Sequence, residues 1–100
     1  MSYELVIGME IKDDAAYARY REAMAPLLAE HGGGFRYDFK IAEVLRNEAG
    51  RAINRVFVIY FKDKAAREAF FARPDYRAIR QQHFDAAVGD TTVIAEYERP

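Results

Sequence analysis

The side chains best suited to chemistry lie at alternating positions of apolar stretches that are typical of β-strands. Arg36 and Asp38 belong to one stretch, and Asn54 and Tyr60 to another. Alternating residues share one face of a strand, so these side chains can meet above a sheet. A tyrosine hydroxyl can donate to a carbonyl or enolate, and a carboxylate in an apolar cavity can act as a base. The predicted binding residues are Glu10, Arg36, Asp38, Asn54, Tyr60 and Glu96.

Proton transfer next to a carbonyl is the reaction that this set suits, with Tyr60 and Asp38 as candidate catalytic residues. His83 is a third candidate, because a histidine can act as a general base near neutral pH. Structural roles compete with these chemical ones. His83 lies on an apolar helical stripe, where a histidine is often part of the packing, and the charged residues can form ion pairs across a dimer.

Metal and nucleotide chemistry find no support in the sequence. The chain has no cysteine, and its two histidines, His31 and His83, are far apart, so no metal-ligand spacing occurs. The glycines 32–34 lack the lysine and the strand-to-helix context of a phosphate-binding loop. We therefore expect neither a metal nor a cofactor.

The composition is that of one globular domain spanning residues 1–100. The sequence is 51% hydrophobic and 31% charged, with a net charge of −1. That balance gives no pull toward nucleic acid, and no stretch approaches the ~20 apolar residues of a membrane span. The first residues lack the cationic and apolar regions of a signal peptide. We expect a cytoplasmic protein that binds neither nucleic acid nor membrane.

The hydrophobic periodicity predicts strands and helices in the order β-α-β-β-α-β. The first helix follows the capping residues Asp13 and Asp14, with a kink or break at Pro26. Asp63 caps the second helix, and Pro74 divides it in two. The predicted strands cover 3–11, 34–45, 53–61 and 91–97, with a hairpin connection at 47–51 and a turn at 89–90. The compact arrangement of these elements is a ferredoxin-like α+β fold, with both helices on one face of a four-stranded antiparallel sheet.

The run Ile53–Phe61 is apolar on both of its alternating faces, which predicts a central strand covered on both sides. Alternation turns Phe57, Ile59 and Phe61 toward the helices. The opposite face, called here the open face, then carries the alternate residues of all four strands. Its predicted apolar members include Val6, Val56, Val58 and Ile94, and its polar members include Glu10, Arg36, Asp38, Tyr60 and Glu96. Alternation likewise assigns Tyr37, Phe39, Val93 and Ala95 to the helix side.

An open face of this kind is more apolar than a soluble monomer usually exposes. Packing against a second copy would bury it, most simply as an isologous homodimer. The polar side chains of the two open faces would then surround a cavity between the subunits. We therefore expect a homodimer formed through the open sheet face, with a small-molecule ligand as its further partner.

Three pieces of sequence are similar, in order and spacing, to one known family. They are DDAAYARYREAMAPLLAEHGG, AEVL, and RVFVIYF leading into FFARPDY. Together they resemble the DUF1330 family of dimeric α+β barrel proteins over nearly the whole chain. The resemblance implies a ferredoxin-like homodimer from a family mostly of unknown function. The chain differs from many members at Asp38–Lys40, where they carry Arg-Gly-Gly, and at Tyr60, where they carry glutamate.

The resulting hypothesis is a dimeric α+β barrel that binds a small molecule, with two alternatives left open. One is a cofactor-independent enzyme of isomerase or monooxygenase type, as in more distant barrel relatives. The other is a non-catalytic module with a ligand-sensing or structural role. An RNA-recognition motif has the same element order, but Val56 and Val58 stand where it would need base-stacking aromatics.

Overall fold

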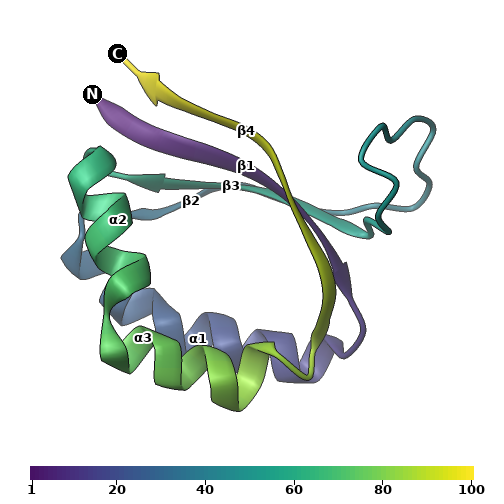
Figure 1. Cartoon of the computed structure of the whole chain (residues 1–100), viewed down its shortest axis with the longest axis horizontal. Coiled ribbons are helices and arrows are strands. Elements are labelled where there is room, and N and C mark those ends of the chain that lie inside the picture. Colours follow the sequence, from purple (N-terminus) through teal and green to yellow (C-terminus); the bar gives the residue numbers. More distant parts are fainter.

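In a computed structural model that describes residues 1–100, a helical layer covers one face of a single sheet (Figure 1). The strands pair antiparallel in the order β2-β3-β1-β4, which places β3 inside the sheet as predicted. The strands are β1 (Ser2–Ile11), β2 (Gly34–Lys40), β3 (Arg55–Phe61) and β4 (Val88–Arg99). The helices are α1 (Asp14–Glu30), α2 (Lys64–Ala72) and α3 (Pro74–Ile79), followed by the π-helical turn η1 (Arg80–Phe84). The predicted ferredoxin-like α+β fold is confirmed.

Both longer helices begin at the aspartates predicted to cap them. Asp13 accepts a hydrogen bond from the backbone N–H of Ala16 at 3.0 Å, and Asp63 accepts one from that of Ala66 at 2.7 Å. Each satisfies a donor that the first helical turn leaves free. The predicted break at Pro26 is absent, because α1 continues through it as one helix. Pro26 lies on the exposed side, where the carbonyl that loses its partner can reach water.

The core lies between the helical layer and the sheet. Leu5 and Phe61, from the two central strands, are among its fully buried members. Phe70 of α2 lies with its ring centroid 5.6 Å from that of Phe61 and 4.5 Å from that of Tyr76. Aromatic pairs at these separations add to the free energy of simple burial. None of the helices has the length and apolar character needed to cross a membrane.

The edge strand β2 carries a β-bulge that reverses part of the predicted face assignment. Its pairing with β3 shifts at Arg36, which has no partner residue. Beyond the shift, Tyr37 and Phe39 pair with valines of the open face, and Asp38 pairs with Phe57 on the helix side. The prediction for these three side chains was wrong, because one extra residue moves every later side chain to the opposite face.

The other edge strand, β4, has the same irregularity. Its pairing with β1 skips Ile94. Ala95 then pairs with Val6 on the open face, and Glu96 lies opposite Leu5 on the helix side. The predicted faces of Ala95 and Glu96 were therefore wrong for the same physical reason.

Two strand boundaries also differ from the prediction. β2 ends at Lys40, and residues 41–54 form an irregular connection that stands away from the sheet (Figure 1). Gly89 and Asp90, predicted as a turn, belong to β4. A Cβ atom added to Gly89 would lie 2.1 Å from a carboxylate oxygen of Glu10, so the glycine lets β4 pass close to Glu10.

The Asp63 cap can be tested with two substitutions. Asp63→Ala removes the acceptor and should lower the free energy of unfolding by about 1 kcal/mol. Asp63→Asn keeps an acceptor at the same place and should cost much less. Urea unfolding at neutral pH measures both, and equal losses in the two variants would contradict the capping role.

Candidate functional site

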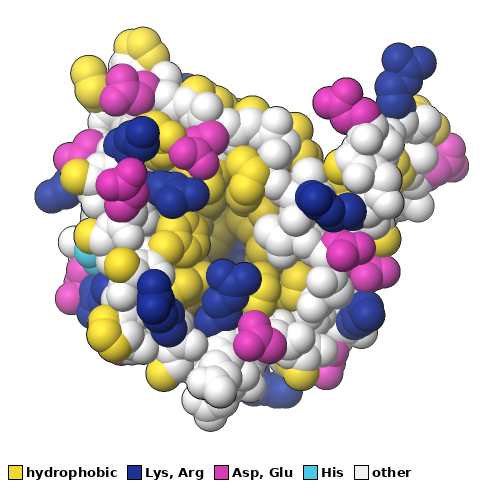
Figure 2. All heavy atoms as spheres, in the orientation of Figure 1, with side chains coloured by type: hydrophobic (Ala, Val, Ile, Leu, Met, Phe, Trp, Pro, Cys, Tyr) yellow, Lys and Arg dark blue, Asp and Glu magenta, His cyan; other side chains and the backbone are white.

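A cavity of about 290 Å³ lies between the helical layer and the sheet. Figure 2 shows it as a hollow with apolar walls and with basic and acidic side chains around its rim. Thirteen of its 17 lining residues are hydrophobic, and its charged members are Arg21, Arg67 and Arg80. No carboxylate lines it. The cavity therefore combines an apolar interior with positive charge.

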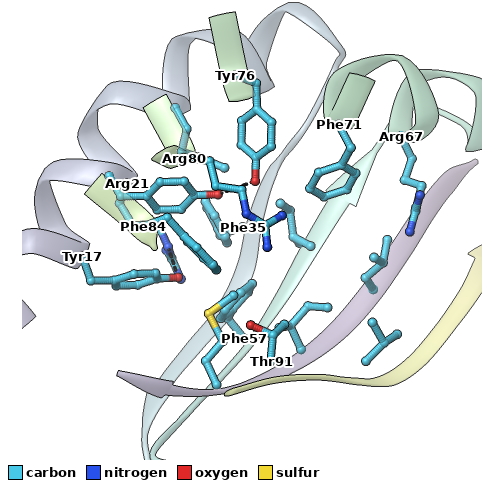
Figure 3. Close-up of a pocket in the computed structure, with 17 residues that line it drawn as sticks. Tyr17, Arg21, Phe35, Phe57, Arg67, Phe71, Tyr76, Arg80, Phe84 and Thr91 are labelled. Atoms are coloured by element: carbon cyan, nitrogen blue, oxygen red, sulfur yellow. Dashed lines mark hydrogen bonds between the residues drawn. The ribbon is translucent and has the colours of Figure 1, made fainter. Parts of the chain in front are cut away.

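Each helical segment supplies one arginine and an aromatic residue four positions away. Residues at this spacing lie on the same face of a helix, so both point toward the sheet. The pairs are Tyr17 with Arg21 on α1 and Arg67 with Phe71 on α2. Arg80 of η1 forms two such pairs, with Tyr76 of α3 and with Phe84 of η1. Figure 3 shows the three arginines among these rings, with Phe57 and Thr91 toward the sheet.

These arginines are not among the site residues that the sequence predicts, although the Arg21 side chain is only 17% exposed. One sequence signal does mark Arg21, Arg67 and Arg80. Each lies four residues from an aromatic residue on the apolar face of its helix.

The Arg21 guanidinium is held by rings and by two polar partners. Its central carbon lies 3.7 Å from the ring centroid of Phe35, a cation–π contact. Its Nε donates to the Tyr17 hydroxyl at 2.8 Å, and its Nη1 donates to Asp38 at 3.3 Å. Its Nη2 is buried and has no hydrogen-bond partner.

Asp38 is shared between two arginines. Arg55 binds it through two hydrogen bonds of 2.8 and 2.9 Å, in addition to the contact from Arg21. The hydrogen bonds from Arg55 lower the pKa of Asp38, an effect that burial opposes and the charge of Arg21 supports. One carboxylate faces two guanidinium groups, so this side of the cavity keeps a net positive charge.

On the β4 side, Arg67 of α2 meets Glu96. Their ion pair has a length of 3.4 Å, and the Tyr3 hydroxyl also donates to Glu96. The hydrogen bond to Glu96 raises the pKa of Tyr3, so this hydroxyl keeps its proton. The Nε of Arg67 is buried without a partner. A second buried guanidinium donor is therefore free in the cavity wall.

Tyr20 and Tyr76 meet hydroxyl to hydroxyl at 2.8 Å in the cavity wall. Burial raises the pKa of both side chains, so both stay protonated at physiological pH. Arg80 stacks beside them, with its guanidinium carbon 4.5 Å from the ring centroid of Phe84. Its ion pair with Asp85 is long, at 3.9 Å.

Of the predicted site residues, Tyr60 and Arg36 lie together, and the others are apart from them. Tyr60 lies on the open face, where its ring centroid is 4.1 Å from the Arg36 guanidinium carbon. Arg36 pairs with Glu4, which is only 2% exposed. Burial raises the pKa of Glu4, but hydrogen bonds from Arg36, Tyr97 and Ser2 outweigh it and leave that pKa below its ordinary value.

The other predicted residues lie at separate places. Asn54 holds the backbone of Ile11 through hydrogen bonds of 2.8 and 2.9 Å. His83 is half-buried in η1, its side chain makes no hydrogen bond or ion pair, and it does not line the cavity. Glu10 lies against β4, and Asp38 and Glu96 lie on opposite edge strands of the helix side.

The fold places the chain among ferredoxin-like α+β proteins. The chain belongs to a family described as "Domain of unknown function (DUF1330)", which it matches over residues 3–97. The resemblance seen in the sequence is thereby confirmed. No curated protein matches the chain.

Several solved structures are similar to this chain. A protein of unknown function from Rhodopseudomonas palustris shares 20% identity with a TM-score of 0.80, covering 99% of this chain and 84% of its own. A dimeric ferredoxin-like protein of unknown function from Jannaschia sp. CCS1 shares 20% identity with a TM-score of 0.58, covering 99% and 100%. A dabb family protein with a ferredoxin-like fold from Mesorhizobium loti shares 15% identity with a TM-score of 0.62, covering 99% and 97%. These similarities establish the fold.

The Asp38 cluster predicts a pH-dependent contribution to stability. The pKa of Asp38 in the folded protein lies below the ordinary value of 3.8, so its stabilisation is present above that pH and is lost as the pH falls through the lower folded value. Asp38→Asn should lower the free energy of unfolding by about 1 kcal/mol at pH 7. The difference between the wild type and the variant should shrink toward pH 3 in urea titrations. A difference that stays constant would contradict the assignment.

Proposed function

We propose that the protein binds a small, largely apolar molecule with one anionic or acceptor-rich group, such as a carboxylate, in the cavity between sheet and helices. One observation carries the proposal: the polar groups of the cavity wall are mainly donors. Two guanidinium N–H groups, on Arg21 and Arg67, are buried without partners, and no carboxylate lines the space. An unpaired buried donor costs about 1–3 kcal/mol, so these two groups show that the cavity wall has more donors than acceptors.

The walls also restrict the ligand body. Most lining residues are hydrophobic, with the rings of Phe35 and Phe57 among them. A volume of about 290 Å³ is at the small end for ligand pockets. These features favour a compact apolar or aromatic acid over a sugar or a nucleotide.

The same residues bear on the choice between enzyme and binding protein. The charged residues of the cavity wall are arginines, and the paired tyrosines have raised pKa values. None of these groups can accept a proton near neutral pH. Binding is therefore our leading function. An enzyme at this site would act by positioning a substrate and stabilising its negative charge.

We also propose that two copies pair through the open face. Tyr37 and Phe39 are 59% and 53% exposed there, with their ring centroids 6.0 Å apart. With the valines of β1 and β3 they extend the apolar surface across three strands. The similar protein from Jannaschia sp. CCS1 is described as dimeric, which supports the pairing.

Binding can be tested with 1-naphthoate, an apolar carboxylate. The chain contains no tryptophan, so naphthalene fluorescence can be followed with little background from the protein. The wild type should bind 1-naphthoate, and Val93→Phe at the cavity wall should weaken binding about tenfold by occupying space.

The matched control is Ile94→Phe. Val93 and Ile94 are adjacent and equally exposed, at 52%, but only Val93 lines this cavity. Ile94→Phe should leave the affinity unchanged. The proposal fails if the wild type does not bind the probe, or if both variants bind it as well as the wild type.

The dimer can be tested with a charge on the open face. Phe39→Glu would bury an unpaired carboxylate in the interface and should give a monomer in sedimentation analysis at micromolar concentration. Ala25→Glu, at an exposed position of α1, is the control and should remain a dimer. A monomeric wild type, or a dimeric Phe39→Glu variant, would rule out pairing through this face.

A further inference from the structure

We infer that the anionic group of the ligand binds between Arg80 and the hydroxyl pair of Tyr20 and Tyr76, which makes these three the specificity-determining residues of the cavity. The inference rests on the proposed function and names the subsite within it. All three side chains line the cavity and come from neighbouring helical elements, α1, α3 and η1. Figure 3 shows Arg80 and Tyr76 on the same helical side of the space.

The hydroxyl pair offers a free donor. Two hydroxyls carry two protons, and the 2.8 Å contact between Tyr20 and Tyr76 uses one of them. Neither oxygen has another side-chain or backbone acceptor within hydrogen-bonding distance. Whichever tyrosine donates to the other, one proton of the pair is left for an acceptor in the cavity. Because burial raises the pKa of both groups, this donor persists across the physiological pH range.

Among the three arginines, Arg80 has the longest contact with a carboxylate, and it already acts on Tyr76 through a hydrogen bond that opposes the rise in the tyrosine pKa. Arg21 has Asp38 at 3.3 Å and the Tyr17 hydroxyl at 2.8 Å, and Arg67 has Glu96 at 3.4 Å. The carboxylate nearest to Arg80 is that of Asp85, at 3.9 Å, beyond the usual length of a hydrogen bond. Its side chain is also 47% exposed, which leaves it room to turn toward a ligand.

The donors of this subsite match the two oxygens of a carboxylate. Arg80 can bind one or both oxygens through its N–H groups, and the free hydroxyl proton can bind one of them. The charge of Arg80 favours an anion over a neutral amide of the same shape. The apolar body would then lie toward Phe35 and Phe57 on the sheet side of the cavity. The inferred ligand class is a compact aromatic or apolar monocarboxylate.

The test compares 1-naphthoate with 1-naphthamide, which share a ring system and differ in charge. Arg80→Gln should weaken naphthoate binding about tenfold and change naphthamide binding by less than about twofold, because a charge-assisted hydrogen bond is lost. Arg77→Gln is the matched control: Arg77 is exposed on the adjacent helix and does not line the cavity. It should bind both probes like the wild type.

Tyr76→Phe tests the hydroxyl pair separately. It removes one hydroxyl and leaves Tyr20 able to donate, so naphthoate binding should weaken by a smaller factor than in Arg80→Gln. The double variant Tyr20→Phe with Tyr76→Phe should weaken binding of both probes, since each has an acceptor oxygen. Thermal unfolding of each variant shows that it is folded before its affinity is compared.

The outcomes separate this inference from the proposed function. If the wild type binds neither probe, the proposed function fails. If the wild type binds naphthoate and Arg80→Gln binds it equally well, the cavity holds a ligand but the assigned subsite is wrong. The inference would also be wrong if Arg80→Gln kept the preference for naphthoate while Arg21→Gln or Arg67→Gln lost it. That result would place the anion at one of the other two arginines.

Discussion

The backbone pairing of each edge strand is interrupted, at Arg36 in β2 and at Ile94 in β4, where a second shift follows near Glu10 of β1. The polar contacts around the cavity depend on the interruptions at Arg36 and Ile94. With regular alternation, Asp38 and Glu96 would point away from the helices. Arg21 and Arg67 would then lack their carboxylate partners among the apolar side chains of the core. The same bulge in β2 sends Tyr37 and Phe39 to the open face. The bulges at Arg36 and Ile94 therefore set both the charge of the cavity and the apolar character of the opposite surface.

Keeping guanidinium groups inside an apolar wall requires compensation for their lost hydration. Aromatic rings provide part of it, since Arg21, Arg67 and Arg80 each lie over a ring at 3.7 to 5.1 Å. Carboxylates provide another part for Arg21 and Arg67. The compensation is incomplete, because two buried N–H groups have no partner. A cavity wall with unpaired donors favours the binding of molecules that carry hydrogen-bond acceptors.

The sequence was sufficient to predict the order of elements, the aspartate caps and the central position of β3, because these follow from periodicity and local chemistry. It could not reveal the bulges, since neither Arg36 nor Ile94 differs in type from an ordinary strand residue. Because the prediction assumed regular alternation, it placed Asp38 and Glu96 on the wrong face of the sheet. The arginines of the helices were missed for a different reason: an arginine on an apolar stripe is rare, and the expectation that charge lies outside prevailed. The predicted roles of Tyr60, Asn54, Glu10 and His83 remain predictions.

The pairing of β1 with β4 has a consequence for how the chain reaches its fold. These are the first and last strands in the sequence, and they lie side by side from Ser2 opposite Arg99 to Ile11 opposite Val88 (Figure 1). During synthesis, one edge of β1 has no partner until β4 has left the ribosome. The sheet can therefore be completed only after β4 has been synthesised, by a contact between segments far apart in the chain. Until then the nascent protein exposes the edge of its own central strand, and that interval is when it is most open to pairing with other chains.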